Sequence, residues 1–395
     1  MIERPRYMAW LNRWREKDVI KVLTGMRRCG KSTILSLYQQ KLLESGVALA
    51  SIQSINFEQM DRAYPREAQA LYDYIVARLA PGTNYVFLDE VQHVEDFERV
   101  VDGLYVRDDV DLYITGSNAK FLSGELATLL TGRYVEVLVQ PLSFAEYRSA
   151  RLEVDVERAF NDYLTYGGLP YVLNIDDPRD IMDYLGGVFN TIVLKDIAQR
   201  NPRMDMRAFD HTASFLADNV GNITSCQRIS RGLAASGRKI STTTVGEYIE
   251  ELKRNFLLFE ARRFDLQGGG YLNTLEKYYL GDLGFRFWLL GKSTGDLGHR
   301  VENAIYLELL HREREVCVGK WRDAEVDFVT LGSGGPHYYQ VALSVLDETV
   351  LDRELAPLQA LRDNYPKTLL TLDRVGSGDH GGIEQVNIID WLLGE

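Results

Sequence analysis

A glycine-rich run near the start of the chain constrains its fold more than any other feature. Residues 25–33 read Gly-Met-Arg-Arg-Cys-Gly-Lys-Ser-Thr, which fits the phosphate-binding pattern G-x-x-x-x-G-K-[ST]. The apolar run at 19–23 predicts a buried strand before it, and residues 33–38 predict the first turns of a helix after it. Strand, glycine loop and helix in this order are what a phosphate loop requires, so a chance match is the weaker interpretation.

The residue types in this run suit the phosphates of ATP. Glycines let backbone N–H groups turn toward phosphate oxygens, and the helix that follows points its positive end at the same anion. We expect Lys31 to reach the β- and γ-phosphates and the Ser32 hydroxyl to hold Mg²⁺. The nucleotide contacts expected from the loop are those of Gly25, Arg28, Cys29, Gly30, Lys31, Ser32 and Thr33.

Length, apolar runs and cysteine spacing limit the class of protein. A chain of 395 residues predicts two or three domains. It contains no apolar run near the roughly 20 residues that span a membrane and no signal peptide, so we expect a cytoplasmic protein without a membrane partner. Cys29, Cys226 and Cys317 lie far apart without metal-ligand spacing, which fits a reducing compartment. A net charge of −12 argues against nucleic-acid binding by the whole surface, but it allows a local basic face.

A second apolar strand ends in two acids. Residues 85–90 read Tyr-Val-Phe-Leu-Asp-Glu, and a buried parallel strand presents its carboxyl end to the ligand. We expect Asp89 to order Mg²⁺ and Glu90 to orient and polarise the attacking water. The alternative is a strand that merely ends in acids at a solvated edge. The phosphate loop earlier in the chain favours the functional interpretation.

A third apolar strand, at 111–118, ends in Gly-Ser-Asn. Ser117 or Asn118 is positioned to hydrogen-bond the γ-phosphate or its water, although turn chemistry also explains these residue types. The chain then predicts a helix at 121–130 and a strand at 134–139.

Residues 19–150 resemble an AAA-type P-loop ATPase of a bacterial and archaeal family. The resemblance is carried by the loop at 25–32, Leu-Asp-Glu-Val-Gln at 88–92, Thr-Gly-Ser at 115–117, Ser-Gly-Glu-Leu at 123–126, Gly-Arg-Tyr at 132–134 and Pro-Leu-Ser-Phe-Ala-Glu-Tyr at 141–147. It implies a sensor role for Ser117 or Asn118. It also makes Arg133 a candidate arginine finger that reaches a neighbouring subunit's γ-phosphate, which implies a homo-oligomer. The alternative for Arg133 is a cation at a helix carboxyl end beside a glycine cap.

Two further segments predict a helical lid and a winged helix. Tyr-Gly-Gly-Leu-Pro at 166–170 resembles the lid motif of signalling-type P-loop ATPases, in which Pro170 would contact the adenine, although a helix-breaking turn needs no ligand. Helices at 225–233 and 241–252, followed by a hairpin of 256–263 with 277–280, follow the winged helix-turn-helix order.

The winged-helix segment is locally basic. Residues 200–265 carry eleven Lys and Arg against eight Asp and Glu, as expected for contact with the phosphates of double-stranded DNA. The best-placed cations are Arg238, Lys239, Arg262 and Arg263. Such modules also bind proteins, and three glutamates on the second helix, at 247, 250 and 251, would repel phosphate.

The last segment resembles the restriction-endonuclease-like fold that often follows this ATPase domain in the same family. Helix 301–310, strands 315–318, 325–331 and 338–343, helix 351–361 and strand 367–372 give the expected order. A nuclease of this class needs an acid on the second strand and Glu-x-Lys on the third. Asp327 supplies the first acid, but Gln340 and Ala342 stand where the Glu and Lys belong, which predicts a degenerate site.

These patterns predict an α/β protein with four parts. They are a parallel-sheet P-loop ATPase domain at 1–150, a helical lid at 151–204, a winged helix-turn-helix at 205–290 and a degenerate nuclease-like domain at 291–395. The favoured function is Mg²⁺-dependent ATP hydrolysis coupled to DNA binding or assembly. The alternatives are a nucleotide switch that acts on an unknown protein partner and an active metal-dependent nuclease.

Overall fold

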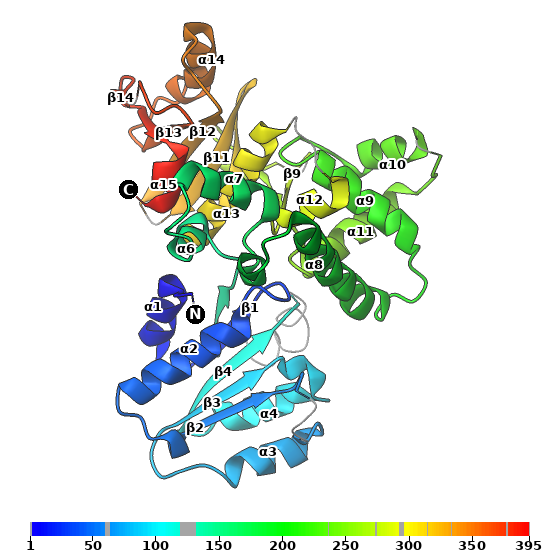
Figure 1. Ribbon diagram of the computed structural model, residues 1–395, viewed down its shortest axis with the longest axis vertical. Coiled ribbons are helices and arrows are strands. Elements are labelled where there is room, and N and C mark those ends of the chain that lie inside the picture. The colour runs from blue at the N-terminus through cyan, green and yellow to red at the C-terminus, as the bar shows by residue number, and fades with distance from the viewer. Residues whose placement is uncertain are drawn as a thin grey trace. The chain divides into compact units, whose positions relative to one another are not determined.

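The computed structural model describes residues 2–59, 64–118, 132–235, 237–272, 275–291, 296–313, 315–332, 334–376 and 378–394. The chain divides into two compact units (Figure 1). The first is Met1–Gln140 with Arg254–Phe256, and the second is Pro141–Lys253 with Leu257–Glu395. The helix predicted at 121–130 and the Ser-Gly-Glu-Leu motif at 123–126 lie outside the described residues.

The first unit is built on a five-stranded sheet in which every pairing is parallel. Its strands, in the order β2-β3-β4-β1-β5, are β1 (Ile20–Thr24), β2 (Ile52–Asn56), β3 (Asn84–Asp89), β4 (Val110–Gly116) and β5 (Tyr134–Leu138). Strands β1 and β3 are buried along their whole length, as their near-continuous apolar runs predict. The strand order reverses at β1, which is where open parallel sheets bind ligands.

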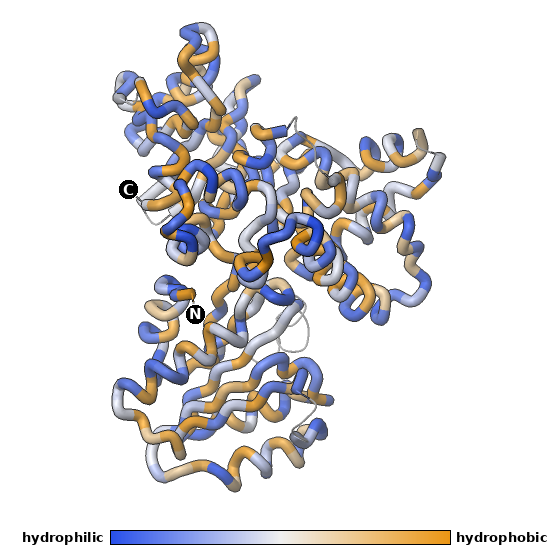
Figure 2. Tube along the Cα trace, in the orientation of Figure 1, coloured by the Kyte–Doolittle hydropathy of each residue, from blue (hydrophilic) through white to orange (hydrophobic). Residues whose placement is uncertain are grey.

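Helices cover both faces of this sheet. They are α1 (Pro5–Trp14), α2 (Lys31–Glu44), α3 (Ala68–Val76) and α4 (Phe97–Tyr105), with the 3-10 turns η1 (Leu49–Ser51) and η2 (Val91–His93). Alternate residues of β3 face opposite sides: Val86 joins the core formed with α3 and α4, whereas the ring of Phe87 stacks on Tyr113 and meets Tyr38 of α2 edge-on. Runs of hydrophobic residues follow the strands in Figure 2. Because the helices occupy both faces, a ligand can approach this sheet at the ends of its strands.

Helix α1 is tied to the phosphate loop. The buried guanidinium of Arg4 donates to the carbonyl oxygens of Cys29 (3.2 Å) and Gln140 (2.8 Å). Tyr7 and Leu11 are buried, so this helix packs against the rest of the first unit.

The second unit begins with a group of helices. They are α6 (Phe144–Ser149), α7 (Val156–Tyr166), η4 (Pro170–Asn174), α8 (Pro178–Thr191), the π-helix η5 (Ile192–Ala198), α9 (Met206–Asp218), α10 (Cys226–Ala235), α11 (Thr242–Arg254) and α12 (Gly284–Leu290). Helices α8 and α12 pack through the rings of Phe189 and Trp288, whose centroids lie 4.7 Å apart. A Cβ on Gly186 would lie 2.4 Å from the Trp288 ring nitrogen, so this close approach requires glycine.

The predicted order of two helices and a hairpin is confirmed in part. Helices α10 and α11 lead into β6 (Leu258–Ala261), which pairs antiparallel with β9 (Lys277–Leu280). The predicted hairpin arm at 256–263 is wrong at its end, because the chain leaves the hairpin there. Arg263 begins β7 (Arg263–Asp265), which pairs with β8 (Gly270–Tyr271) and β10 in a larger sheet.

The carboxyl-terminal part contains an eight-stranded sheet in the order β14-β15-β13-β12-β11-β10-β7-β8. The further strands are β10 (Val316–Trp321), β11 (Ala324–Gly332), β12 (Gly335–Ala342), β13 (Lys367–Thr371), β14 (Gly378–Asp379) and β15 (Glu384–Asn387), with helices α13 (Leu297–Arg312), α14 (Glu348–Gln359) and α15 (Ile388–Leu393). The predicted helix, three strands, helix and strand are confirmed, whereas β14, β15 and α15 were not predicted. Across the described ranges, none of the helices combines the length and apolarity that crossing a bilayer demands.

Candidate nucleotide site

The glycines of the phosphate loop have backbone requirements of their own. Gly25 follows β1 with φ 148°, and Gly30 precedes α2 with φ 105°. A Cβ on Gly25 would lie 2.1 Å from the Val139 carbonyl oxygen, so no other residue fits there. The predicted strand, loop and helix are present, and the loop lies at the carboxyl end of β1.

Lys31 is the buried cation of this loop. Its ammonium donates to the carbonyl oxygens of Gly25 (2.9 Å) and Met26 (3.1 Å) and forms an ion pair with Glu90 at 3.3 Å. Burial alone would lower the pKa of Lys31, but the acidic groups Cys29, Glu90 and Asp89 raise it above its ordinary value. The ammonium is therefore charged, and three acceptors match its three donors.

Asp89 ends β3 and is held by three side chains. Its carboxylate accepts hydrogen bonds from the Thr115 hydroxyl (2.6 Å) and the Asn56 amide (2.7 Å), and the Ser32 hydroxyl also donates to it. Burial raises the pKa of Asp89, and the hydrogen bonds from Ser32 and Thr115 act against this rise. A hydroxyl beside a carboxylate is a pair of oxygen ligands that suits Mg²⁺. The residues at this position thus fit the predicted metal.

Glu90 has an unusual backbone for a residue with a side chain. Its φ of 56° lies in the left-handed region, and its N–H donates to the Thr115 hydroxyl oxygen at 2.8 Å. The fully buried Thr115 thus supports both acids, because the same hydroxyl donates to Asp89. Left-handed backbone at a non-glycine residue persists only where its surroundings hold it.

The Glu90 carboxylate is connected to Ser117 through Gln92. The Gln92 amide donates to Glu90 and, at 3.3 Å, to the Ser117 hydroxyl oxygen. Burial alone would raise the pKa of Glu90, but the charge of Lys31 and hydrogen bonds from Gln92 and Ser117 lower it below its ordinary value. Glu90 is therefore ionised near neutral pH. Asn118, the other predicted sensor, donates to the Asn255 side chain at 3.3 Å.

Three residues of this site were not predicted from the sequence. Asn56, Gln92 and Thr115 all hydrogen-bond to the acids at the end of β3. The available signal was position: Asn56 ends β2 and Thr115 lies near the end of β4, and these two strands flank β3. Parallel strands bring such ends to one edge of the sheet.

Arg133 lies at the opposite edge of the same sheet. Its carbonyl oxygen accepts from the N–H of Ile20, the first residue of β1, at 2.8 Å. The phosphate loop starts at the other end of this five-residue strand, roughly 16 Å away. The guanidinium forms an ion pair with Asp102 and lies over the Tyr105 ring. The structure therefore does not bring Arg133 to its own subunit's phosphate loop.

Pro170 begins η4 after a tightly held turn in the second unit. The Gly168 N–H donates to the Asp282 carboxylate (2.8 Å), and its carbonyl oxygen accepts from the Leu142 N–H (2.7 Å). A Cβ on Gly167 would lie 2.0 Å from an Asp282 oxygen. Burial raises the pKa of Asp282 to about 6. The turn thus has a structural role, and the predicted adenine contact of Pro170 stays a prediction.

The four cations predicted to bind DNA lie in two different segments. Arg238 and Lys239 lie in the connection between α10 and α11. The Arg262 guanidinium lies 3.8 Å from the centroid of the Tyr271 ring, and Arg263 belongs to β7 of the eight-stranded sheet. Only the first pair therefore accompanies the two predicted helices of the helix-turn-helix.

A lysine does lie beside Asp327, the acid predicted for the nuclease site, but it comes from β9. The buried Lys277 ammonium forms ion pairs with Glu325 (2.9 Å), Glu302 (3.4 Å) and Asp327 (3.9 Å). The position expected for this lysine from the sequence was that of Ala342. Spatial proximity of a residue from another strand leaves no local signal in the sequence.

The carboxylates around Lys277 have further partners. Glu302 accepts from the Tyr279 hydroxyl (2.7 Å), and Asp327 accepts from the Val341 N–H (3.0 Å). Burial raises the pKa of Asp327 to about 7, although the Lys277 charge acts against this rise. The ammonium takes the central position among the carboxylates that a metal ion would need. We therefore assign no catalytic step to this network.

The shared hydroxyl of Thr115 gives a test of the nucleotide site's support. Thr115→Val removes the hydroxyl, so the buried Asp89 carboxylate and Glu90 N–H each lose a partner. We expect the free energy of unfolding, measured by urea denaturation, to fall by about 1–3 kcal/mol. Thr191→Val, at a partly exposed residue whose hydroxyl donates to the Gly187 carbonyl oxygen within α8, is the control. Equal losses in the two variants would contradict the shared-support role.

The Lys277 network gives a second test. Lys277→Met leaves buried carboxylates unpaired, and we expect a loss of about 3–5 kcal/mol in the free energy of unfolding near neutral pH. A raised folded-state pKa of Asp327 makes stability fall as pH rises between 3.8 and about 7. Because Lys277 holds that pKa down, its removal extends the loss to higher pH.

The loss in Lys277→Met should therefore be larger at about pH 8 than at about pH 5. Thermal denaturation at both pH values measures this difference, with Lys195→Met, an exposed residue of η5, as the control. A loss that does not depend on pH would mean that Lys277 contributes by packing alone.

Comparisons with known proteins agree with the geometry of the first unit. Residues 17–148 match a family model described as an AAA domain, and residues 157–296 match a domain of unknown function (DUF8612). An uncharacterized protein of Haemophilus influenzae is 37% identical over 400 residues, which covers 100% of this chain and 99% of that protein. The uncharacterized protein MJ1544 of Methanocaldococcus jannaschii is 26% identical over 396 residues, covering 94% of this chain and 85% of that protein.

A solved structure with a similar fold is the Walker-type ATPase paby2304 of Pyrococcus abyssi. The TM-score is 0.52 at 16% identity, and the match covers 73% of this chain and 96% of that chain. These comparisons do not test the restriction-endonuclease-like interpretation of residues 291–395, which stays a prediction. The chain belongs to the same family as the Haemophilus influenzae protein, and its first part is a P-loop ATPase domain of the AAA type.

Proposed function

We propose that the protein hydrolyses ATP at the cluster around Lys31 and Glu90. The observation that carries this proposal is the buried ion pair of these two residues, at 3.3 Å, beside the glycine loop. It brings a cation for the phosphates and an ionised carboxylate to the same edge of the sheet. A cation and a base held together in a buried site are the parts that phosphoryl transfer to water requires.

The chain's own residues divide the work in this proposal. A phosphate that reaches Lys31 replaces one of its three acceptors, and the contact with Glu90 is the longest of the three. Glu90, still bonded to Gln92, then orients the attacking water and accepts its proton. Ser32 and Asp89 would hold Mg²⁺, which supplies charge neutralisation on the phosphates when bound.

Glu90→Gln tests this assignment. The substitution keeps the side-chain shape but removes the base, so we expect ATP turnover to fall at least about 100-fold. ATP binding should be kept or strengthened, because the Lys31 ammonium no longer shares its charge with a carboxylate. Phosphate release and nucleotide-binding assays measure the two effects separately. Glu95→Gln, at an exposed residue nearby, is the control, and undiminished turnover in Glu90→Gln would exclude Glu90 as the base.

We further propose that Arg133 acts on the nucleotide of a neighbouring subunit, so that the active form is a homo-oligomer. Its position at the edge of the sheet opposite the phosphate loop supports an action between subunits over one within a subunit. The competing role is the surface ion pair with Asp102, in which both side chains are more than 40% exposed. Exposed pairs of this kind contribute about 0–1 kcal/mol to stability.

A pair of variants separates the two roles of Arg133. Arg133→Ala and Asp102→Asn both remove the ion pair, but only the first removes the guanidinium. If Arg133 reaches a neighbour, Arg133→Ala should lose turnover by about 10³-fold or more, whereas Asp102→Asn should retain it. Mixing Arg133→Ala with Glu90→Gln should restore part of the turnover, because one interface then carries both groups. Equal turnover in the two single variants would mean that Arg133 contributes through its ion pair with Asp102 alone.

We propose that the nucleotide state is coupled to DNA binding or assembly. Support comes from the local basic composition of residues 200–265 and from helices α10 and α11 followed by the β6–β9 pair. The alternative is a nucleotide switch that acts on a protein partner. Turnover that is insensitive to duplex DNA would favour this alternative. Nuclease activity is the third possibility, and the Lys277 network argues against it.

A further inference from the structure

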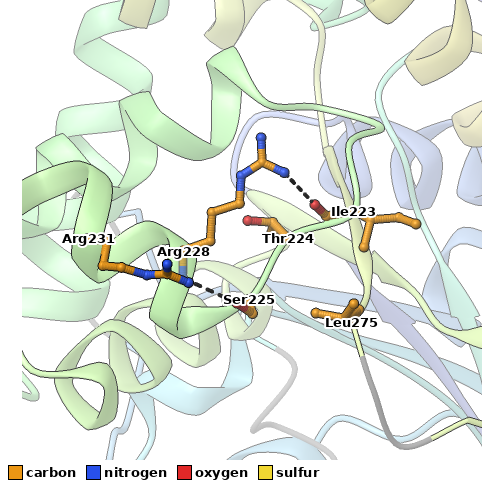
Figure 3. Close-up of a pocket in the computed structure, with 6 residues that line it drawn as sticks. All are labelled: Ile223, Thr224, Ser225, Arg228, Arg231 and Leu275. Atoms are coloured by element: carbon orange, nitrogen blue, oxygen red, sulfur yellow. Dashed lines mark hydrogen bonds between the residues drawn. The ribbon is translucent and has the colours of Figure 1, made fainter.

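A pocket beside the amino end of α10 is used by none of the functions above. Its volume is about 550 Å³, which lies within the range of small-molecule sites. Figure 3 shows its lining, which is two arginines, two hydroxyl residues and two aliphatic residues: Arg228, Arg231, Thr224, Ser225, Ile223 and Leu275. All six belong to the second unit.

Two cations face this pocket from the same side of one helix. Arg228 and Arg231 are three residues apart on α10, so they lie on one helix face. One terminal nitrogen of Arg228 donates to the Ile223 carbonyl oxygen at 2.9 Å, which orients the guanidinium at the pocket wall. The Nε of Arg231 contacts the Gln227 carbonyl oxygen at 3.4 Å. Both guanidinium groups keep further N–H donors that can reach an anion.

The Thr224 hydroxyl is the observation that indicates a ligand. Thr224 is 2% exposed, and its hydroxyl has no hydrogen-bond partner within the part of the chain that the structure describes. Figure 3 shows this hydroxyl pointing toward the Arg228 side chain. A buried hydroxyl without a partner is costly, so a site that retains one calls for an explanation. A ligand oxygen in the pocket would satisfy it.

The remaining groups set the charge of the ligand. Ser225 accepts from the Arg228 N–H at 3.2 Å and so caps α10, whose positive dipole end lies at the pocket. The nearest acid along the chain, Glu276, has its carboxylate bonded to the Tyr278 hydroxyl at 2.7 Å. Two arginines, hydroxyl donors and a helix amino end together select an anion with several acceptor oxygens. Ile223 and Leu275 add an apolar surface beside it.

We propose that this pocket binds a phosphate group of a nucleic-acid strand, with the attached sugar or base against Ile223 and Leu275. The assignment to a strand rests on the DNA contact proposed above, whereas the binding of phosphate itself does not. The site differs from the four cations predicted from the sequence. A phosphodiester of a strand and the phosphate of a free nucleotide share this chemistry, and the test separates them.

Protection of arginines from phenylglyoxal tests the site on the full-length protein. Modification of Arg228 and Arg231 is followed peptide by peptide in the presence of inorganic phosphate, thymidine 5′-monophosphate or a short DNA duplex. We expect phosphate and duplex to slow their modification several-fold. Arg158 and Arg179, exposed on α7 and α8, are the internal controls and should be unaffected. Protection by the mononucleotide but not by the duplex would overturn the strand assignment, and no protection at all would overturn the pocket.

Variants give an independent measure through duplex affinity. Arg228→Gln with Arg231→Gln should weaken binding about tenfold or more, because charge-assisted hydrogen bonds are lost. The matched double variant Arg158→Gln with Arg179→Gln should not. Thr224→Val should also weaken binding while leaving the melting temperature unchanged or higher, since its hydroxyl loses no partner in the protein. Duplex affinity that is unchanged in both site variants would overturn the proposal. If the protein without substitutions showed no ATP turnover, that result would count against the ATPase proposal alone.

Discussion

The buried ion pair between Lys31 and Glu90 is the interaction on which the candidate nucleotide site depends. Each charge lies out of water, and each would be costly without the other. The pair connects the loop after β1 to the end of β3, so the two halves of the site hold each other in place. Thr115 completes the arrangement from β4, because one hydroxyl fixes both acids. Groups that follow or belong to three adjacent strands, β1, β3 and β4, therefore hold this one pair of opposite charges in place.

The same physical rule has a different outcome in the second unit. Lys277 is as deeply buried as Lys31, yet it faces carboxylates of Glu302, Glu325 and Asp327. At the first site an incoming phosphate can replace the Glu90 carboxylate beside Lys31, because Glu90 keeps its hydrogen bond from Gln92. At the second, the protein's own ammonium already serves as the cation. One buried lysine is thus poised for exchange, and the other completes a closed network.

Local patterns predicted the loop, β1 and β3 because their constraints lie within a few consecutive residues. The glycine pattern and the apolar run ending in Asp89 and Glu90 need no distant partner to be recognised. Thr115 and Gln92 were not predicted as site residues, because common polar residues gain their roles only when strands pair. Lys277 reaches its acids from another segment altogether. Arg263 lies outside the predicted hairpin because its strand, β7, pairs with β10, which lies far along the chain.

The contact of Arg4 with the Gln140 carbonyl has a consequence for how the protein is made. Arg4 is synthesised before α1 and the phosphate loop, but one of its two carbonyl partners, Gln140, follows β5 and comes 136 residues later. The phosphate loop therefore cannot acquire its final support until all five strands of the parallel sheet have been synthesised. Domains generally fold as units during synthesis, and this bond makes the support of the phosphate loop depend on the segment that follows β5.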